Sequence, residues 1–76
     1  MKSVQDRFLN ELRKSKVPCT IIIVNGYQLK NAIVQEFDNF VIVLMVDGSQ
    51  KLLFKHSISS ITPNSPISYG DYEDEK

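Results

Sequence analysis

The sequence has few of the residues on which catalytic, metal-binding and secreted small proteins depend. It contains one cysteine, Cys19, one histidine, His56, and no tryptophan. A lone cysteine excludes an internal disulfide and a multi-cysteine metal site, so we expect a reducing, cytoplasmic location. No apolar run approaches the roughly 20 residues of a membrane-spanning helix, and no signal-peptide pattern is expected at the N-terminus.

The chain is also short, with 76 residues, which allows one module. Its composition, 42% apolar and 24% charged, is typical of globular proteins. Chains of this size bury little of their surface and are usually marginally stable alone. Because disulfides and cysteine-based metal sites are excluded, we expect oligomerisation to supply stability.

A net charge of zero conceals an uneven distribution along the sequence. Residues 1–16 hold five basic and two acidic residues, whereas residues 71–76 hold four acidic residues and one lysine. The basic segment indicates an anionic partner, and the acidic tail could compete for the same surface. The alternative is that both ends are simply solvated.

The first 18 residues predict one amphipathic helix. Ser3 and Asp6 have the spacing of a capping box. Apolar residues then recur at helical spacing, basic residues gather in the last turn, and Pro18 prevents continuation. We therefore predict a helix over about residues 4–15.

The rest of the chain reads as strands joined by tight turns. Asn25-Gly26 and Asp47-Gly48 are two-residue hairpin signals between runs of β-branched and apolar residues. The predicted strands are Thr20–Val24, Tyr27–Glu36, Phe40–Val46, Ser49–Lys55 and Ile58–Thr62.

One helix and five short strands predict a mainly β fold, a strongly bent, partly closed small barrel of the SH3-like or OB-like kind. The last two strands are expected to leave open edges that pair with a neighbouring copy, head to tail, and close into a ring. From Asn64 onward the sequence has little to bury and is expected to be disordered. We assign residues 4–65 to the domain and 66–76 to a disordered acidic tail.

The chemistry-bearing residues favour binding over catalysis. His56 and Cys19 lie in different predicted strands, no glycine-rich phosphate loop is present, and the acidic residues sit beside turns or caps. We therefore predict no catalytic residues, no metal and no cofactor. Lys55-His56 near Phe54, together with Phe40, could instead bind phosphates and stack on bases. The alternative is that both phenylalanines belong to the core.

Four segments, taken together and in order, resemble the bacterial Hfq family of Sm-like RNA chaperones. These are Gln5-Asp6-x-Phe8-Leu9-Asn10, Val24-Asn25-Gly26-Tyr27-Gln28-Leu29, Phe37-Asp38-Asn39-Phe40 and Phe54-Lys55-His56-Ser57-Ile58-Ser59. The resemblance runs from about Val4 to Pro63. It implies an Sm-like fold, a homohexameric ring, and non-enzymatic binding of single-stranded RNA that promotes pairing of small regulatory RNAs with messenger RNAs.

The resemblance also implies three RNA-binding surfaces. The helix-side, or proximal, face would bind uridine-rich RNA through Gln5, Asn39, Phe40, Lys55 and His56. The opposite, or distal, face would bind purine-rich RNA through Ile22, Ile23, Asn25, Gly26, Tyr27, Gln28, Leu29, Lys30 and Ser60. The rim would contact RNA through Asn10, Arg13, Lys14, Lys16 and Phe37.

The sequence departs from the family pattern at two places that matter for function. Ile22 stands where the family usually has an aromatic residue that stacks on a distal purine. Asn31-Ala32 replaces an expected strand glycine, and a bulge there would preserve the bend, since Asn tolerates left-handed backbone geometry. The rival hypothesis is a ring of the same fold that binds a protein and has only incidental affinity for RNA.

Overall fold

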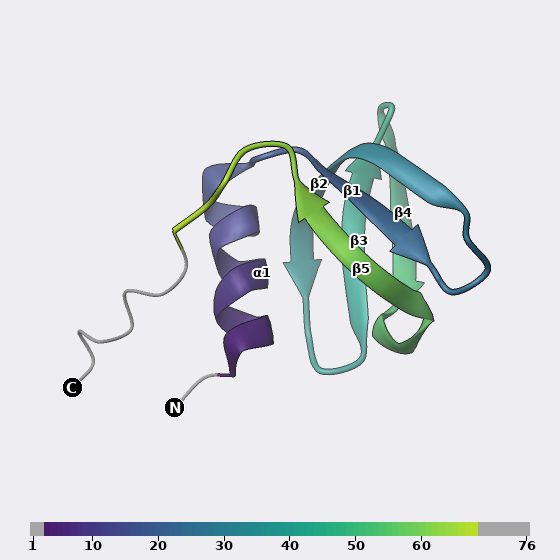
Figure 1. Cartoon of the computed structure of the whole chain (residues 1–76), viewed down its shortest axis with the longest axis horizontal. Helices are drawn as coiled ribbons and strands as arrows, with labels where there is room; N and C mark the ends of the chain where they lie inside the picture. Colours follow the sequence, from purple (N-terminus) through teal and green to yellow (C-terminus); the bar gives the residue numbers. More distant parts are fainter. Residues whose placement is uncertain (1–2, 69–76) are drawn as a thin grey trace.

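In the computed structural model, which describes residues 3–68, one helix precedes a single five-stranded antiparallel sheet (Figure 1). The strands follow one another in space as β4-β3-β2-β1-β5, so β4 and β5 are the two edges. This order confirms the predicted helix, the five strands and the two open edges. The elements are α1 (Val4–Ser15), β1 (Cys19–Ile23), β2 (Gln28–Phe37), β3 (Val41–Val46), β4 (Ser49–Phe54) and β5 (Ile58–Pro63).

Most predicted boundaries differ from the observed ones by one residue, but one difference changes the site. The sequence placed Lys55 and His56 at the end of a strand, and this prediction was wrong. They form a 3-10 turn, η1 (Lys55–Ser57), between β4 and β5. The Val24 backbone N–H donates to the Ser57 carbonyl at 2.8 Å, which ties this turn to the end of β1. The turn redirects the chain from one sheet edge to the other.

Helix α1 begins and ends at residues that form hydrogen bonds with its terminal N–H and C=O groups. The Ser3 hydroxyl accepts from the Asp6 backbone N–H at 3.0 Å, as the capping pattern predicted. Lys16 takes a left-handed conformation (φ 55°) and donates its N–H to the Leu12 carbonyl. The buried face of the helix carries Leu9 and Leu12, and α1 packs against β2.

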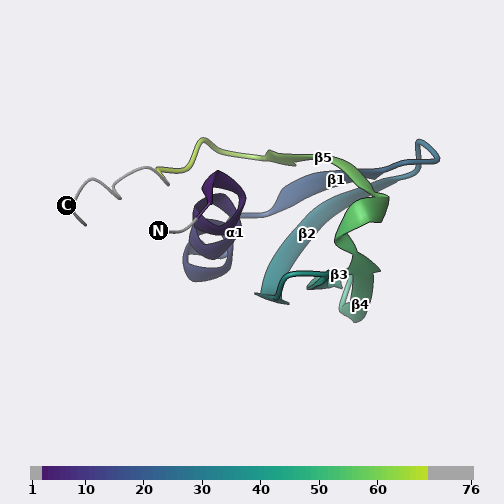
Figure 2. The ribbon, with the colours of Figure 1, turned by 90° about the horizontal axis from the view of Figure 1, so that it is seen from below.

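Strand β2 bends sharply because it contains two bulges. Cys19 of β1 faces Ala32 and Ile21 faces Leu29, so β2 has an extra residue there, and Asn31 has a φ of 57°. This confirms the predicted bulge. A second bulge follows where Val34 and Glu36 of β2 face consecutive residues of β3. Figure 2 shows the resulting curve, which lets β2 pair with β1 along one half and β3 along the other.

The core lies between the helix and the curved sheet. No polar or charged side chain is buried within residues 3–68. The core consists of Leu9, Leu12, Cys19, Ile21, Leu29, Ala32, Val34, Ile42, Leu44 and Val46. Burial of these apolar side chains is the main favourable contribution to folding.

The segment after β5 contacts the domain, which the sequence did not indicate. The Asn64 backbone N–H donates to the Pro18 carbonyl at 2.8 Å, and its side-chain amide donates to the Asn31 side-chain oxygen at 3.1 Å. Ile67 packs against the core. The prediction that disorder begins at Asn64 was therefore wrong for Asn64 and Ile67, which make these contacts. Residues 69–76, which include the acidic tail, lie outside the described part of the chain.

Cys19 is fully buried, as a small strand residue was expected to be, and its thiol donates to the Ala32 carbonyl at 3.4 Å. Burial raises the pKa of the Cys19 thiol to about 11. At pH 8 such a thiol is about 0.1% thiolate, against about a quarter for an ordinary cysteine.

We therefore expect the folded protein to react with iodoacetamide at pH 8 at least about 100-fold more slowly than a free cysteine. The reaction should become normal in denaturant. Mass spectrometry of timed samples measures both rates, and rapid labelling of the folded protein would contradict the assigned position of Cys19.

Candidate nucleic-acid interface

The loop between β2 and β3 presents Phe40 to solvent. One Asp38 carboxylate oxygen, Oδ1, accepts from the backbone N–H groups of Phe40 at 2.8 Å and Val41 at 2.9 Å. The Asp38 N–H donates to the Val41 carbonyl at 3.0 Å. The Phe40 side chain is 73% exposed, so it is not a core aromatic, and most of its surface is accessible to a partner.

Lys55 lies beside this loop. Its backbone N–H donates to the Phe40 carbonyl at 2.7 Å. Its ammonium nitrogen lies 5.2 Å from the centroid of the Phe37 ring, within cation–π range. His56, the next residue, stacks on Phe54 with ring centroids 5.8 Å apart. Two aromatic rings thus flank the Lys55-His56 pair, and a third ring, Phe40, stands next to it.

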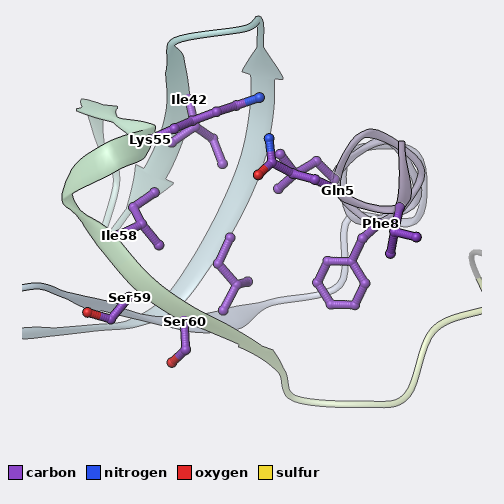
Figure 3. Close-up of a pocket in the computed structure, with 10 residues that line it drawn as sticks. Gln5, Phe8, Ile42, Lys55, Ile58, Ser59 and Ser60 are labelled. Atoms are coloured by element: carbon purple, nitrogen blue, oxygen red, sulfur yellow. The ribbon is translucent and has the colours of Figure 1, made fainter. Parts of the chain in front are cut away.

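Gln5 and Lys55 line a shared cavity of about 370 Å³ between α1, β3 and β5. Figure 3 shows their polar ends pointing toward one another across it. Apolar side chains from the helix and the sheet supply most of the remaining lining, among them Phe8, Ile42 and Ile58. This arrangement offers an apolar surface with one amide and one cation at its polar side.

The other predicted proximal residues stand outside that cavity. Asn39 lines a smaller cavity of about 130 Å³ with Asn10 and Phe37. The Phe40 carbonyl accepts from the Lys55 backbone N–H, so Phe40 lies next to a residue of the Gln5–Lys55 cavity. His56 follows Lys55 directly in the 3-10 turn η1. A single chain therefore brings together Gln5, Lys55 and Phe40, whereas Asn39 faces the helix.

On the distal side, Tyr27 is held at the start of a groove. The Asn25 side chain accepts from the Tyr27 backbone N–H at 2.9 Å, and Gly26 has a φ of 92°, which favours glycine. Tyr27 is 62% exposed. The groove, of about 550 Å³, is lined by Tyr27, Gln28, Leu29, Lys30, Asn31, Val46, Asp47, Ser49 and Lys51.

Four predicted distal residues need separate comment. Leu29 is 7% exposed and its side chain belongs to the core, because strand alternation turns it inward, yet the residue also lines the groove beside Tyr27; its role as an RNA contact stays a prediction. Ile23 is half-buried against the core. Ile22 pairs with Ser60 in the β1–β5 ladder, so the two side chains share a face, and Ser60 is also one of the residues that line the Gln5–Lys55 cavity.

The predicted rim residues divide into two groups. Arg13 and Lys16 line a cavity of about 410 Å³ whose other residues come from β2 and β3. Arg13 also donates to the Asn10 side-chain oxygen, and Lys14 lies 3.9 Å from the Glu11 carboxylate. Phe37 lies instead beneath the Lys55 ammonium, which links this predicted rim residue to the proximal face.

Comparison with known proteins places this geometry in a family. The model of the family described as Hfq protein matches residues 4–68 of the chain. The chain belongs to the Hfq family. The resemblance predicted from four sequence segments is thereby confirmed.

Individual Hfq proteins agree with this assignment. The RNA-binding protein Hfq of Desulforudis audaxviator is 51% identical over 65 residues, covering 86% of this chain and 77% of its own. That of Clostridium beijerinckii is 49% identical over 71 residues, covering 93% and 86%. A crystal structure of the pleiotropic translational regulator Hfq superimposes with a TM-score of 0.76 at 33% identity, covering 79% of this chain and 98% of that one.

Two further observations concern alternative classes of protein. Within residues 3–68, no group of three or more His, Cys, Asp or Glu side chains is arranged to hold a metal ion. The described part of the chain also has no helix with the length and hydropathy needed to span a bilayer.

Sequence reasoning did not single out Phe8 or Asp38 as site residues. Phe8 was interpreted only as part of the apolar helix face, and its place at the cavity depends on how α1 docks. Asp38 was grouped with the acidic residues that satisfy turn donors, which is what it does. The sequence feature that could have indicated this role is that Asp38 precedes the aromatic Phe40, at the start of a predicted strand, by two residues.

The Asp38 carboxyl has a lowered pKa, and the cause is local. The backbone N–H groups of Phe40 and Val41 lower it most, and the positive charge of Lys55 contributes least. Because the pKa of the folded state lies below that of the unfolded state, the ionised group stabilises the loop at neutral pH. That stabilisation is lost as the pH falls through the folded-state pKa.

We expect the Asp38 carboxyl to titrate below its ordinary value of 3.8 when followed by carbon-detected NMR. The Lys55→Ala variant should retain most of this depression, since hydrogen bonds dominate it. An ordinary pKa in the unaltered protein, or a full return to 3.8 in Lys55→Ala, would contradict the loop geometry.

Proposed function

We propose that this Hfq-family protein binds single-stranded RNA and promotes pairing between small regulatory RNAs and messenger RNAs, and thereby regulates translation after transcription. Family membership supports this, since its relatives are named RNA-binding proteins and the crystallised homologue a pleiotropic translational regulator. The observation that carries the proposal is the solvent-facing Phe40 ring, held by backbone hydrogen bonds beside Lys55. The protein acts as a binding protein, not as an enzyme.

The proximal face binds a uridine-rich strand by stacking and hydrogen bonding. A base placed on an exposed aromatic ring gains roughly 1–3 kcal/mol. Phe40 supplies that ring, and the amide of Gln5 and the ammonium of Lys55 reach the polar edge of the base from their shared cavity. His56, exposed on the adjacent turn, contacts ribose or phosphate.

Several copies of the chain complete this site by forming a ring, which we propose is a hexamer. Edge strands β4 and β5 have unpaired backbone groups, and β4 exposes Leu52 and Phe54, at 55% and 53%. Pairing of β4 in one copy with β5 in the next is head to tail and closes a ring. Each uridine is then placed between the Phe40 rings of neighbouring copies, and repetition raises the effective concentration of the strand.

The distal face and the rim add weaker contacts. Tyr27 is the aromatic on which a purine stacks, and Gln28, Lys30, Asn25 and Gly26 border it. Because Ile22 replaces a second aromatic, Tyr27 supplies the main stacking surface. At the rim, Arg13 and Lys16 contact phosphates, and such contacts weaken as salt concentration rises. The cytoplasmic location and the boundary of the acidic tail stay predictions.

Replacing Phe40 by alanine should weaken binding of a uridine-rich oligomer by about tenfold or more, since one stacking surface per copy is lost. Fluorescence anisotropy with labelled hexauridine measures the affinity. Tyr27→Ala is the matched control: it removes an equally exposed aromatic, and it should weaken binding of a purine-rich oligomer only. Unchanged hexauridine affinity in both Phe40→Ala and Lys55→Ala would favour the rival hypothesis of a protein-binding ring.

Native mass spectrometry should show an assembly of six copies. Leu52→Glu, which places a charge on the exposed apolar side of edge strand β4, should shift the protein toward smaller species. Val24→Glu is the control, because Val24 is also exposed but lies in the β1–β2 turn. A monomeric unaltered protein would contradict the ring, and a different number of copies would correct its stoichiometry.

A further inference from the structure

The orientation of the Phe40 ring cannot come from side-chain packing. At 73% it is the most exposed of the large apolar side chains in residues 3–68. A side chain with so few neighbours can change rotamer, so its backbone, which fixes the Cβ position, determines the region that the ring can reach. The groups that fix this backbone therefore control the stacking surface.

Four hydrogen bonds fix this backbone, and three of them involve Asp38. Its Oδ1 accepts from the N–H groups of Phe40 and Val41, at 2.8 and 2.9 Å, and its own N–H donates to the Val41 carbonyl at 3.0 Å. The Phe40 carbonyl then accepts from the Lys55 N–H at 2.7 Å. The Asp38 turn thus connects the aromatic ring to the cation beside it.

We propose that Asp38 is a positioning residue for uridine-rich RNA. Its side-chain oxygen orders residues 38–41 so that Phe40 and Lys55 stand in their binding arrangement before RNA arrives. This rests on the proposed function, in which Phe40 stacks on bases. Ordering a loop in the free protein removes that entropic penalty from the binding step.

The negative charge of Asp38 and its hydrogen bonds have opposite effects on the affinity for RNA. A carboxylate close to Lys55 repels phosphate, so removing the charge alone should tighten RNA binding. Removing the hydrogen-bond acceptor should loosen the loop and weaken binding. Asparagine separates the two effects because its side-chain oxygen can accept from the same backbone groups and it favours this kind of turn.

The test compares Asp38→Ala with Asp38→Asn in hexauridine anisotropy titrations of the full chain. We expect Asp38→Ala to weaken binding by about three- to tenfold, since each lost hydrogen bond contributes modestly. Asp38→Asn should bind as tightly as the unaltered protein or more tightly. Glu36→Ala is the matched control, because it removes an exposed carboxylate two residues away. It should not weaken binding.

Three companion measurements separate positioning from general damage. Oligoadenylate affinity and assembly mass should be unchanged in Asp38→Ala, and the folded state should be retained with a thermal midpoint only slightly lower, since the lost hydrogen bonds stabilise an exposed loop and not the core. Loss of any of these would overturn a positioning role in favour of a structural one. Asp38→Asn as weak as Asp38→Ala would overturn it in favour of charge.

Phe40→Ala in the same titration keeps the two proposals distinguishable. If Phe40→Ala weakens hexauridine binding and Asp38→Ala does not, the inference about Asp38 fails and the proposed function stands. If Phe40→Ala itself has no effect, the proposed function fails.

Discussion

The bend of β2 is the constraint on which the rest of the structure depends. Its two bulges, one at Asn31 with left-handed geometry and one between Val34 and Glu36, let one strand pair with β1 and with β3. A flat strand of ten residues could not close a core with so few partners. Tyr27 and Phe40 lie just beyond opposite ends of β2, so the two aromatic rings are displayed from different places.

The aromatic side chains of the described residues are divided between the border of the core, where Phe8 and Phe37 pack against it, and the surface. The fully buried positions are aliphatic residues and Cys19, whereas Phe40, Phe54 and Tyr27 are exposed. Exposed aromatics next to unpaired sheet edges are unfavourable for an isolated chain. The unpaired edges become favourable when neighbouring copies cover them, and the exposed aromatic rings become favourable when unstacked nucleic acid bases cover them. The proposed assembly and the proposed RNA contacts would therefore meet the same physical need.

The sequence predicted the elements whose signals are local and missed the relations that depend on three-dimensional packing. The Ser3 cap, the Asn25-Gly26 turn and the Asn31 bulge each follow from the conformational preferences of one or two residues. The burial of Leu29 depends on which face of β2 is covered. The contact between Phe37 and Lys55 joins residues 18 positions apart, and the packing of Ile67 depends on the path of the chain beyond β5.

Under the proposed function, the candidate surfaces differ in the physical origin of their affinity for RNA. At Phe40 and Tyr27 the main contribution is stacking, which is nearly independent of salt and tolerant of sequence. At Arg13 and Lys16 it is phosphate contact, which salt weakens. Lys55 combines a charge with an aromatic contact: its ammonium lies over the Phe37 ring, and the residue shares a cavity with Gln5. On the proposed proximal face, selectivity for the base is therefore assigned to the Gln5–Lys55 cavity, since neither stacking nor phosphate contact can read the polar edge of a base.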